Sequence, residues 1–305
     1  MIKSGSMNAL AKCFDWFYAE TRLALLDRIL VYVSISTFML HLLMVALANV
    51  LRDPPPVIAA VGKNYLSAIY TPFSFILFYE VFLLIIALPK STTQSIAKQF
   101  EIVSLIFVRH FFKDIASLGD IGKLAKPSPE VLEMFLNVLA GLFMFLLVTV
   151  FLHTARKTLR SVNRIQESAE LQLFIAQKKI IALVLTVALV SLAVYSLVAY
   201  LNDYSQVVYR GAAQKFDPNT IFYSELFTIM IFADVLILIL SLALFDKKYE
   251  FVFRNVAFVI STILIRFSLT SAREYSAALA IGGMLFGLFT LLIYNYNLRM
   301  QAIST

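Results

Sequence analysis

Long apolar stretches constrain the fold of this sequence more than any other feature. A transmembrane helix needs about 20 mostly apolar residues, and six stretches meet that length with few charges: 29–51, 67–89, 131–153, 179–201, 222–245 and 276–297. Two weaker stretches, 99–117 and 251–271, each contain an arginine. A soluble domain has roughly half apolar and about a quarter charged residues, whereas this chain is 60% hydrophobic and 15% charged. The sequence therefore predicts an all-α integral membrane protein with about eight transmembrane helices. The alternative is six spans with two buried or re-entrant segments.

The basic residues follow the ends of these stretches. With a cytoplasmic N-terminus, sixteen Lys and Arg residues fall in the inside segments and eight in the outside loops. Cytoplasmic loops of membrane proteins carry the excess of Lys and Arg, so we expect both termini in the cytoplasm. The net charge of +7 then reflects topology, and nucleic acid is not an expected partner. We expect a multi-pass protein of the plasma or inner membrane, in contact with the lipid bilayer.

The segments outside the spans are short. Residues 1–28 mix charges with aromatic side chains, Trp16 among them, which is typical of an amphipathic helix at the membrane interface. Residues 154–178 contain no Pro or Gly and predict a cytoplasmic helical connector. The single cysteine, Cys13, precludes a disulfide within the chain.

The two halves of the chain resemble each other at a period of about 150 residues, the kind of repeat that membrane transporters often contain. The segment FSFILFYEV (73–81) aligns with FTIMIFADV (227–235). The polar and small residues that align are Glu80 with Asp234, Arg109 with Arg266, Ser104 with Ser261, and Gly141 with Gly287. We predict two tandem four-helix repeats, 29–153 and 179–298. Because four is even, both repeats would have the same orientation in the membrane.

The aligned charges lie deep in their spans. Glu80 is nine residues from Pro89, about 13 Å at the helical rise, and Arg109 is eleven residues from Lys98, about 16 Å. A charge at the centre of a bilayer costs about 2.5–3.5 kcal/mol on insertion scales, so such a group needs a partner. We predict two intramembrane ion pairs, Glu80–Arg109 and Asp234–Arg266. They would either fix helix packing or line a path for ions or protons.

The remaining polar candidates are weaker. His41, His110, Ser104 and Ser261 are secondary candidates for a transport path. Isolated histidines more often serve packing, and no Cys or carboxylate lies beside them at metal-ligand spacing. We expect neither a metal nor a cofactor.

Small residues mark expected helix contacts. Gly283 and Gly287 are four residues apart, a spacing that lets helices approach closely, and Gly141 is their counterpart in the first repeat. These glycines predict packing faces between repeats or between subunits of a homo-oligomer.

Enzyme motifs such as HExxH, GxSxG and the P-loop are absent from the sequence, although an enzyme with an unfamiliar site stays open. The sequence favours a channel or secondary transporter for ions, protons or small solutes. The alternative is a non-catalytic scaffold or subunit of a larger membrane complex, in which the ion pairs are structural.

Overall fold

The computed structural model describes residues 4–118, 128–162, 169–210, 218–244 and 249–304, and all regular secondary structure in these ranges is helical. The helices are α1 (Ser4–Phe17), α2 (Glu20–Val50), α3 (Pro56–Val61), α4 (Ser67–Ala87), α5 (Thr92–Leu118), α6 (Pro129–Val162), α7 (Ala169–Arg210), α8 (Pro218–Leu244), α9 (Tyr249–Thr270) and α10 (Arg273–Ser304).

Seven helices of the described chain are long and apolar enough to cross a membrane: α2, α4, α6, α7, α8, α9 and α10. The protein is therefore an integral, multi-pass membrane protein. Of the two weaker predicted spans, the one that contains Arg266 corresponds to α9 and belongs to this set. The other corresponds to α5, which has 27 residues but five charged side chains, so it is long enough to span without being as apolar.

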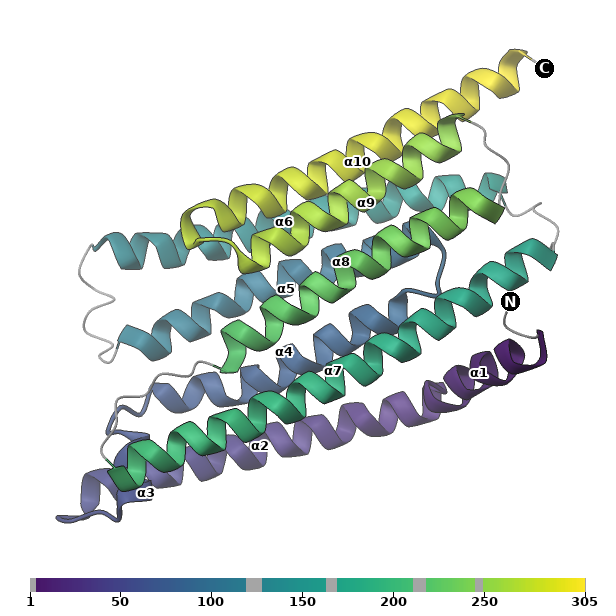
Figure 1. The fold of residues 1–305 in the computed structure, drawn as a ribbon. Coiled ribbons are helices and arrows are strands. Elements are labelled where there is room, and N and C mark those ends of the chain that lie inside the picture. Colours follow the sequence, from purple (N-terminus) through teal and green to yellow (C-terminus); the bar gives the residue numbers. More distant parts are fainter. Residues whose placement is uncertain (1–3, 119–127, 163–168, 211–217, 245–248, 305) are drawn as a thin grey trace.

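The long helices form two rows (Figure 1). In each row every helix packs against the next along the chain, first α2, α4, α5 and α6, then α7, α8, α9 and α10. The rows meet where α6 packs on α10, α5 on α9, and α4 on α7. Both chain ends lie at one end of the bundle and α3 lies at the other. We call these the proximal and the distal end.

Two large apolar cores lie in the described part of the bundle, and each draws on both rows; a small third cluster surrounds Val131 and Met134 of α6. Core 1 is built from α1, α4, α7 and α8, with Ile102 and Ile106 of α5 added, and its largest fully buried side chains include Ile85, Leu185 and Met230. Core 2 is built from α5, α6, α9 and α10. The boundary between them, which we call the seam, runs between α4 and α5 and between α8 and α9.

Glycines bring the helices of core 2 into close contact. A Cβ atom added to Gly141 of α6 would lie 3.3 Å from the carbonyl oxygen of Ser104 in α5. One added to Gly287 of α10 would lie 2.8 Å from the Ser261 hydroxyl in α9, and one added to Gly283 would lie 3.1 Å from the Ser261 carbonyl oxygen. Only a residue without Cβ allows these backbones to pack so closely.

The N-terminal segment divides earlier than residue 28. α1 ends at Phe17 and α2 begins at Glu20, so residues 20–28 belong to the same helix as the first span. α1 packs on α7, with a Lys179–Asp15 ion pair of 2.7 Å and a Tyr18–Thr186 hydroxyl contact of 2.5 Å. The Thr186 hydroxyl donates to the Ala182 carbonyl over 2.8 Å, so the Tyr18 hydroxyl is the donor in this contact. Burial raises the pKa of the Tyr18 phenol.

Between the rows, α6 continues to Val162 and α7 begins at Ala169. Both helices therefore extend into the predicted connector, of which residues 163–168 lie outside the described ranges.

Candidate functional site

The first contact across the seam joins α4 to α5. Arg109 Nη2 of α5 forms an ion pair with Glu80 Oε2 of α4, and both side chains are about nine-tenths buried. Arg109 Nε also donates a hydrogen bond of 3.3 Å to the Leu105 carbonyl of its own helix. The Nη1 atom of Arg109 is buried, and within the described ranges it has no hydrogen-bond partner.

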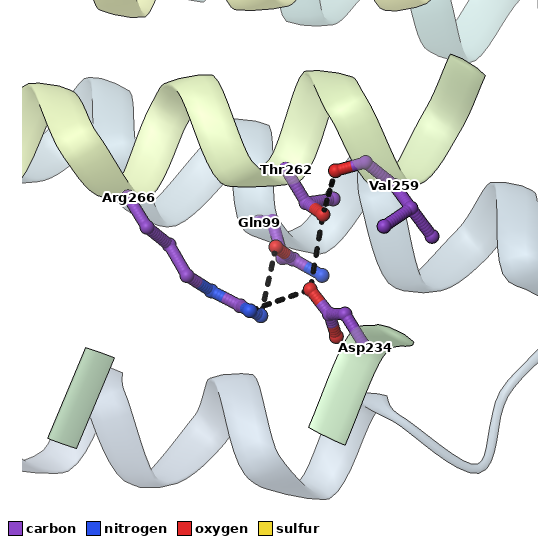
Figure 2. Close-up of polar contacts among 5 residues, drawn as sticks. All are labelled: Gln99, Asp234, Val259, Thr262 and Arg266. Atoms are coloured by element: carbon purple, nitrogen blue, oxygen red, sulfur yellow. Dashed lines mark hydrogen bonds and ion pairs between the residues drawn. The ribbon is translucent and has the colours of Figure 1, made fainter. Parts of the chain in front are cut away.

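The second contact across the seam joins α8 to α9 and reaches the first row (Figure 2). Arg266 Nη1 lies 2.5 Å from Asp234 Oδ2, and both residues are buried. The Thr262 hydroxyl, one turn before Arg266, lies 2.9 Å from the same carboxylate oxygen. Arg266 Nη2 donates a hydrogen bond of 3.4 Å to Gln99 Oε1 of α5. Asp234 therefore accepts from two groups on α9, while Gln99 ties the pair to the other half of the chain.

A cavity of about 270 Å³ opens on the seam toward the distal end. We call it the distal cavity. Its residues come from α4, α5, α8 and the end of α9: Tyr70, Phe73, Leu77, Ile106, Arg109, His110, Lys113, Tyr223, Ser224, Phe227, Leu269, Thr270 and Ser271. Its wall therefore combines apolar side chains with hydroxyl groups, and one face of α5 contributes Arg109, His110 and Lys113.

A smaller cavity of about 40 Å³ lies on the seam toward the proximal end. This proximal cavity is lined by polar groups that include Gln99, Asp234 and Thr262, and by Lys178 of α7. Lys178 is 3% exposed, and its ammonium donates a hydrogen bond of 2.8 Å to the Lys90 carbonyl. A buried ammonium and a buried carboxylate thus share one small cavity.

A thin layer of protein separates the two cavities. Along α5 the lining residues pass from Gln99 to Ile106, along α8 from Phe227 to Asp234, and along α9 from Thr262 to Leu269. Seven residues of helix span about 10 Å. Glu80 and Arg266 lie within this layer by their positions on α4 and α9. Each ion pair therefore joins one cavity to this layer. Arg109 lines the distal cavity and Asp234 lines the proximal cavity, while their partners Glu80 and Arg266 lie between the two.

The remaining predicted residues lie apart from this layer or support it. His110 lines the distal cavity, whereas His41 contacts the Thr71 hydroxyl at 2.5 Å, between α2 and α4. The Ser104 hydroxyl donates to the Glu101 carbonyl and the Ser261 hydroxyl to the Gly283 carbonyl, each over 2.7 Å. Both serines are buried against the glycines of the following helix.

Several seam residues were not predicted from the sequence, namely Gln99, Thr262, Lys178, Lys113 and Tyr223. For Lys178, the position on the helix could have shown that the side chain is buried. Lys178 lies four residues before Ala182 and seven before Leu185, on the buried stripe of α7. Lys179, its neighbour, lies off that stripe and pairs with Asp15.

In the described ranges no group of three or more His, Cys, Asp or Glu residues is arranged to hold a metal ion. The chain matches no known family model, no curated protein and no solved structure. The function has to be inferred from the geometry of the seam.

Proposed function

We propose that the protein is a secondary transporter for small solutes, and that the solute crosses along the seam. The observation that carries this proposal is the pair of cavities on the seam, one toward each end of the bundle, separated by a layer of about 10 Å. A transporter needs a path closed on one side at a time, and rocking of one body against another around a central site supplies it. Core 1 and core 2 are candidates for these two bodies.

The ion pairs are suited to hold such a seam together reversibly. Breaking a buried pair is costly, whereas exchanging one buried partner for another costs far less. Glu80–Arg109 and Asp234–Arg266 both join core 1 to core 2. Lys178 lies beside Asp234 as a second cation. Each end of the seam therefore has charges that can pair differently when the cores move.

We also propose that the chain is a tandem duplication of four helices. Three kinds of contact support it. The second and third helices of each half are joined by an acid–arginine pair. The fourth helix of each half packs a glycine on the third beside an aligned serine. The succession of neighbouring helices is the same in both rows. Because both chain ends lie at the proximal end (Figure 1), the basic loops favour that end as the cytoplasmic one.

The test measures the flux of a solute down its own concentration gradient into liposomes that contain the purified full-length protein. The probes are concentration jumps of chloride, benzoate, glutamate, lysine and glucose, with protein-free liposomes as the blank. We expect flux of at least one probe with the wild type. We expect Glu80→Gln and Asp234→Asn to reduce it about tenfold or more, because a shift of 1.4 kcal/mol in the barrier already gives tenfold.

The matched control is Glu101→Gln. Glu101 is also an acid that pairs with a basic residue, Lys98, but it lies on the surface of α5, so its loss should leave flux unchanged. Absence of flux for every probe with folded wild-type protein would favour the scaffold function instead. Unchanged flux in folded Glu80→Gln and Asp234→Asn would remove the ion pairs from the path.

A further inference from the structure

We infer that the solute is a small monocarboxylate with an apolar body, and that its carboxylate binds Arg109 and Lys113 in the distal cavity. This inference names the substrate class of the same seam and so rests on the proposed function. It starts from the charges that line the two cavities.

Cations outnumber acids along the seam. The described residues that line the cavities, or pair with those that do, include four cations, namely Arg109, Lys113, Lys178 and Arg266, and two carboxylates, Glu80 and Asp234. No carboxylate is among the described residues that line the distal cavity. Asp114 and Glu225 each follow a lining residue in the sequence, but neither of these acids lines the distal cavity. An anion entering the distal cavity therefore meets the Lys113 ammonium and an Arg109 guanidinium of which Glu80 holds one nitrogen.

The geometry of Arg109 leaves a binding position. Its Nη2 atom holds Glu80, while its buried Nη1 atom has no hydrogen-bond partner among the described residues. A buried donor without an acceptor is unfavourable, and a carboxylate oxygen is the acceptor that a guanidinium binds best. Lys113, one turn along α5, has its ammonium 5.9 Å from the centre of the Tyr70 ring. The two cations thus face one cavity from one helix.

The shape of the cavity selects the rest of the molecule. Its volume of about 270 Å³ is slightly below the roughly 300–1,000 Å³ typical of ligand pockets, so the ligand is small. Phe73, Phe227 and Leu269 contribute apolar surface to the same cavity. Burying apolar ligand surface favours binding in proportion to the area buried, a gain that a strongly hydrated ion such as chloride or phosphate does not have. A ligand with a single carboxylate on an aromatic or branched aliphatic body fits both the cations and the apolar surface of the cavity.

The test uses three planar probes that share one shape and differ in charge: benzoate, benzamide and benzamidine. Their binding to the full-length protein in lipid nanodiscs is measured by calorimetry, with empty nanodiscs as the blank. We expect benzoate to bind most tightly and benzamidine least. Lys113→Gln should weaken benzoate by about three- to tenfold, the effect of one charge at a few ångströms in a partly solvated site. Lys113 is exposed, so this variant should fold.

Lys63→Gln is the matched control, because Lys63 is another exposed lysine of the distal end, in the loop between α3 and α4. It should leave benzoate affinity unchanged. Binding of benzamide or benzamidine as tight as that of benzoate, or no benzoate binding, overturns the inference. So does benzoate affinity that Lys113→Gln leaves unchanged.

The two proposals fail separately. Charge-selective benzoate binding without benzoate flux in liposomes would retain the carboxylate site and overturn transport. Flux of lysine or glucose together with no benzoate binding would retain transport and overturn the carboxylate inference.

Discussion

At the scale of single residues, the Asp234 environment is unusual because two cations compete for one carboxylate. Arg266 pairs with Asp234 directly, and Lys178 lies in the same cavity as Asp234 and donates a hydrogen bond to the Lys90 carbonyl. Removing either member of a buried ion pair costs about 3–5 kcal/mol, because the other charge is left buried alone. At this site the two removals are not equivalent.

We therefore predict that Asp234→Asn destabilises the protein more than Arg266→Gln does. The first variant leaves two buried cations without a carboxylate, whereas the second leaves Asp234 with the Thr262 hydroxyl and with Lys178 nearby. We expect a loss of about 3–5 kcal/mol for Asp234→Asn and clearly less for Arg266→Gln. The free energy of unfolding in detergent micelles measures both, and the double variant gives the coupling between them.

Lys98→Gln is the control for that cycle, since Lys98 pairs with Glu101 at the surface of α5 and exposed pairs contribute about 0–1 kcal/mol. If Arg266→Gln proves as destabilising as Asp234→Asn, Lys178 does not act as a second partner.

The sequence was informative at this scale only where a charge interrupted an apolar run. Glu80, Arg109, Asp234 and Arg266 stand out for that reason, and the structure brings them together in pairs. Lys178 did not stand out, because it begins a span next to a second lysine and both resemble the basic residues that flank spans. Only its helical phase relative to the buried side of α7 distinguishes it.

At the scale of helices, the packing of α10 on α9 depends on which glycine faces the neighbour. Gly283 and Gly287 point at α9, whereas a Cβ added to Gly282 would meet nothing within 4 Å. The three glycines belong to one helix, so alanine substitutions at these positions change the helix backbone in the same way. A difference in their effects on stability therefore reports packing.

We predict that Gly287→Ala destabilises the protein and Gly282→Ala does not. The Gly287 methyl would lie 2.8 Å from the Ser261 hydroxyl and 2.9 Å from the fully buried Phe100 ring. The hydroxyl is held by its bond to the Gly283 carbonyl. Overpacking of this kind costs about 1–3 kcal/mol. Gly282→Ala should instead be neutral, or stabilise by up to about 1 kcal/mol through the unfolded state.

Unfolding by sodium dodecyl sulfate in mixed micelles compares these two variants under one set of conditions. Equal stability of the two would mean that α10 does not pack on α9 through Gly287.

Helix existence was predictable from the sequence, and helix boundaries were less so. The division between α1 and α2 at residues 18 and 19 has no Pro or Gly to mark it, so the charged residues up to Arg28 were assigned to the interfacial helix. The short helix α3 begins at the last of three consecutive prolines and has only six residues, too few for a periodic pattern to predict it. The charges of α5 reduce its mean hydropathy, so its place beside α4 and α6 depends on packing.

At the scale of the whole molecule, the seam cuts across the two rows of helices. One row runs from α2 to α6 and the other from α7 to α10, whereas each core takes helices from both rows. The sequence does not predict this division. Helices such as α4 are apolar on every side, and in a membrane both the lipid-facing and the buried sides are apolar, so no periodic pattern marks the inner face.

We predict that a cross-link over the seam stops transport, whereas a cross-link within one core does not. Phe73 of α4 and Phe112 of α5 stack across the seam, with ring centres 4.3 Å apart. Phe111 of α5 and Phe135 of α6 lie on one side of it, with ring centres 6.4 Å apart. Both pairs are replaced by cysteines in a Cys13→Ser background, since Cys13 is the single native cysteine.

Flux is measured before and after treatment with a thiol-specific bifunctional reagent that is cleaved by reduction. Reduction should restore flux in the Phe73/Phe112 variant, and the Phe111/Phe135 variant should keep its flux throughout. Full flux in a completely cross-linked Phe73/Phe112 variant would exclude movement of the two cores at the seam.

The docking of α1 on α7 also has a consequence for how the protein is made. The residues that join these helices are 164 and 168 positions apart in the chain, so α1 leaves the ribosome long before its partner exists. At roughly 5–20 residues per second, α1 waits roughly 10–30 s while the first row enters the membrane. Helix α1 is therefore made before α7 but forms its contacts late. It can dock only after α7 has been synthesised and has entered the bilayer.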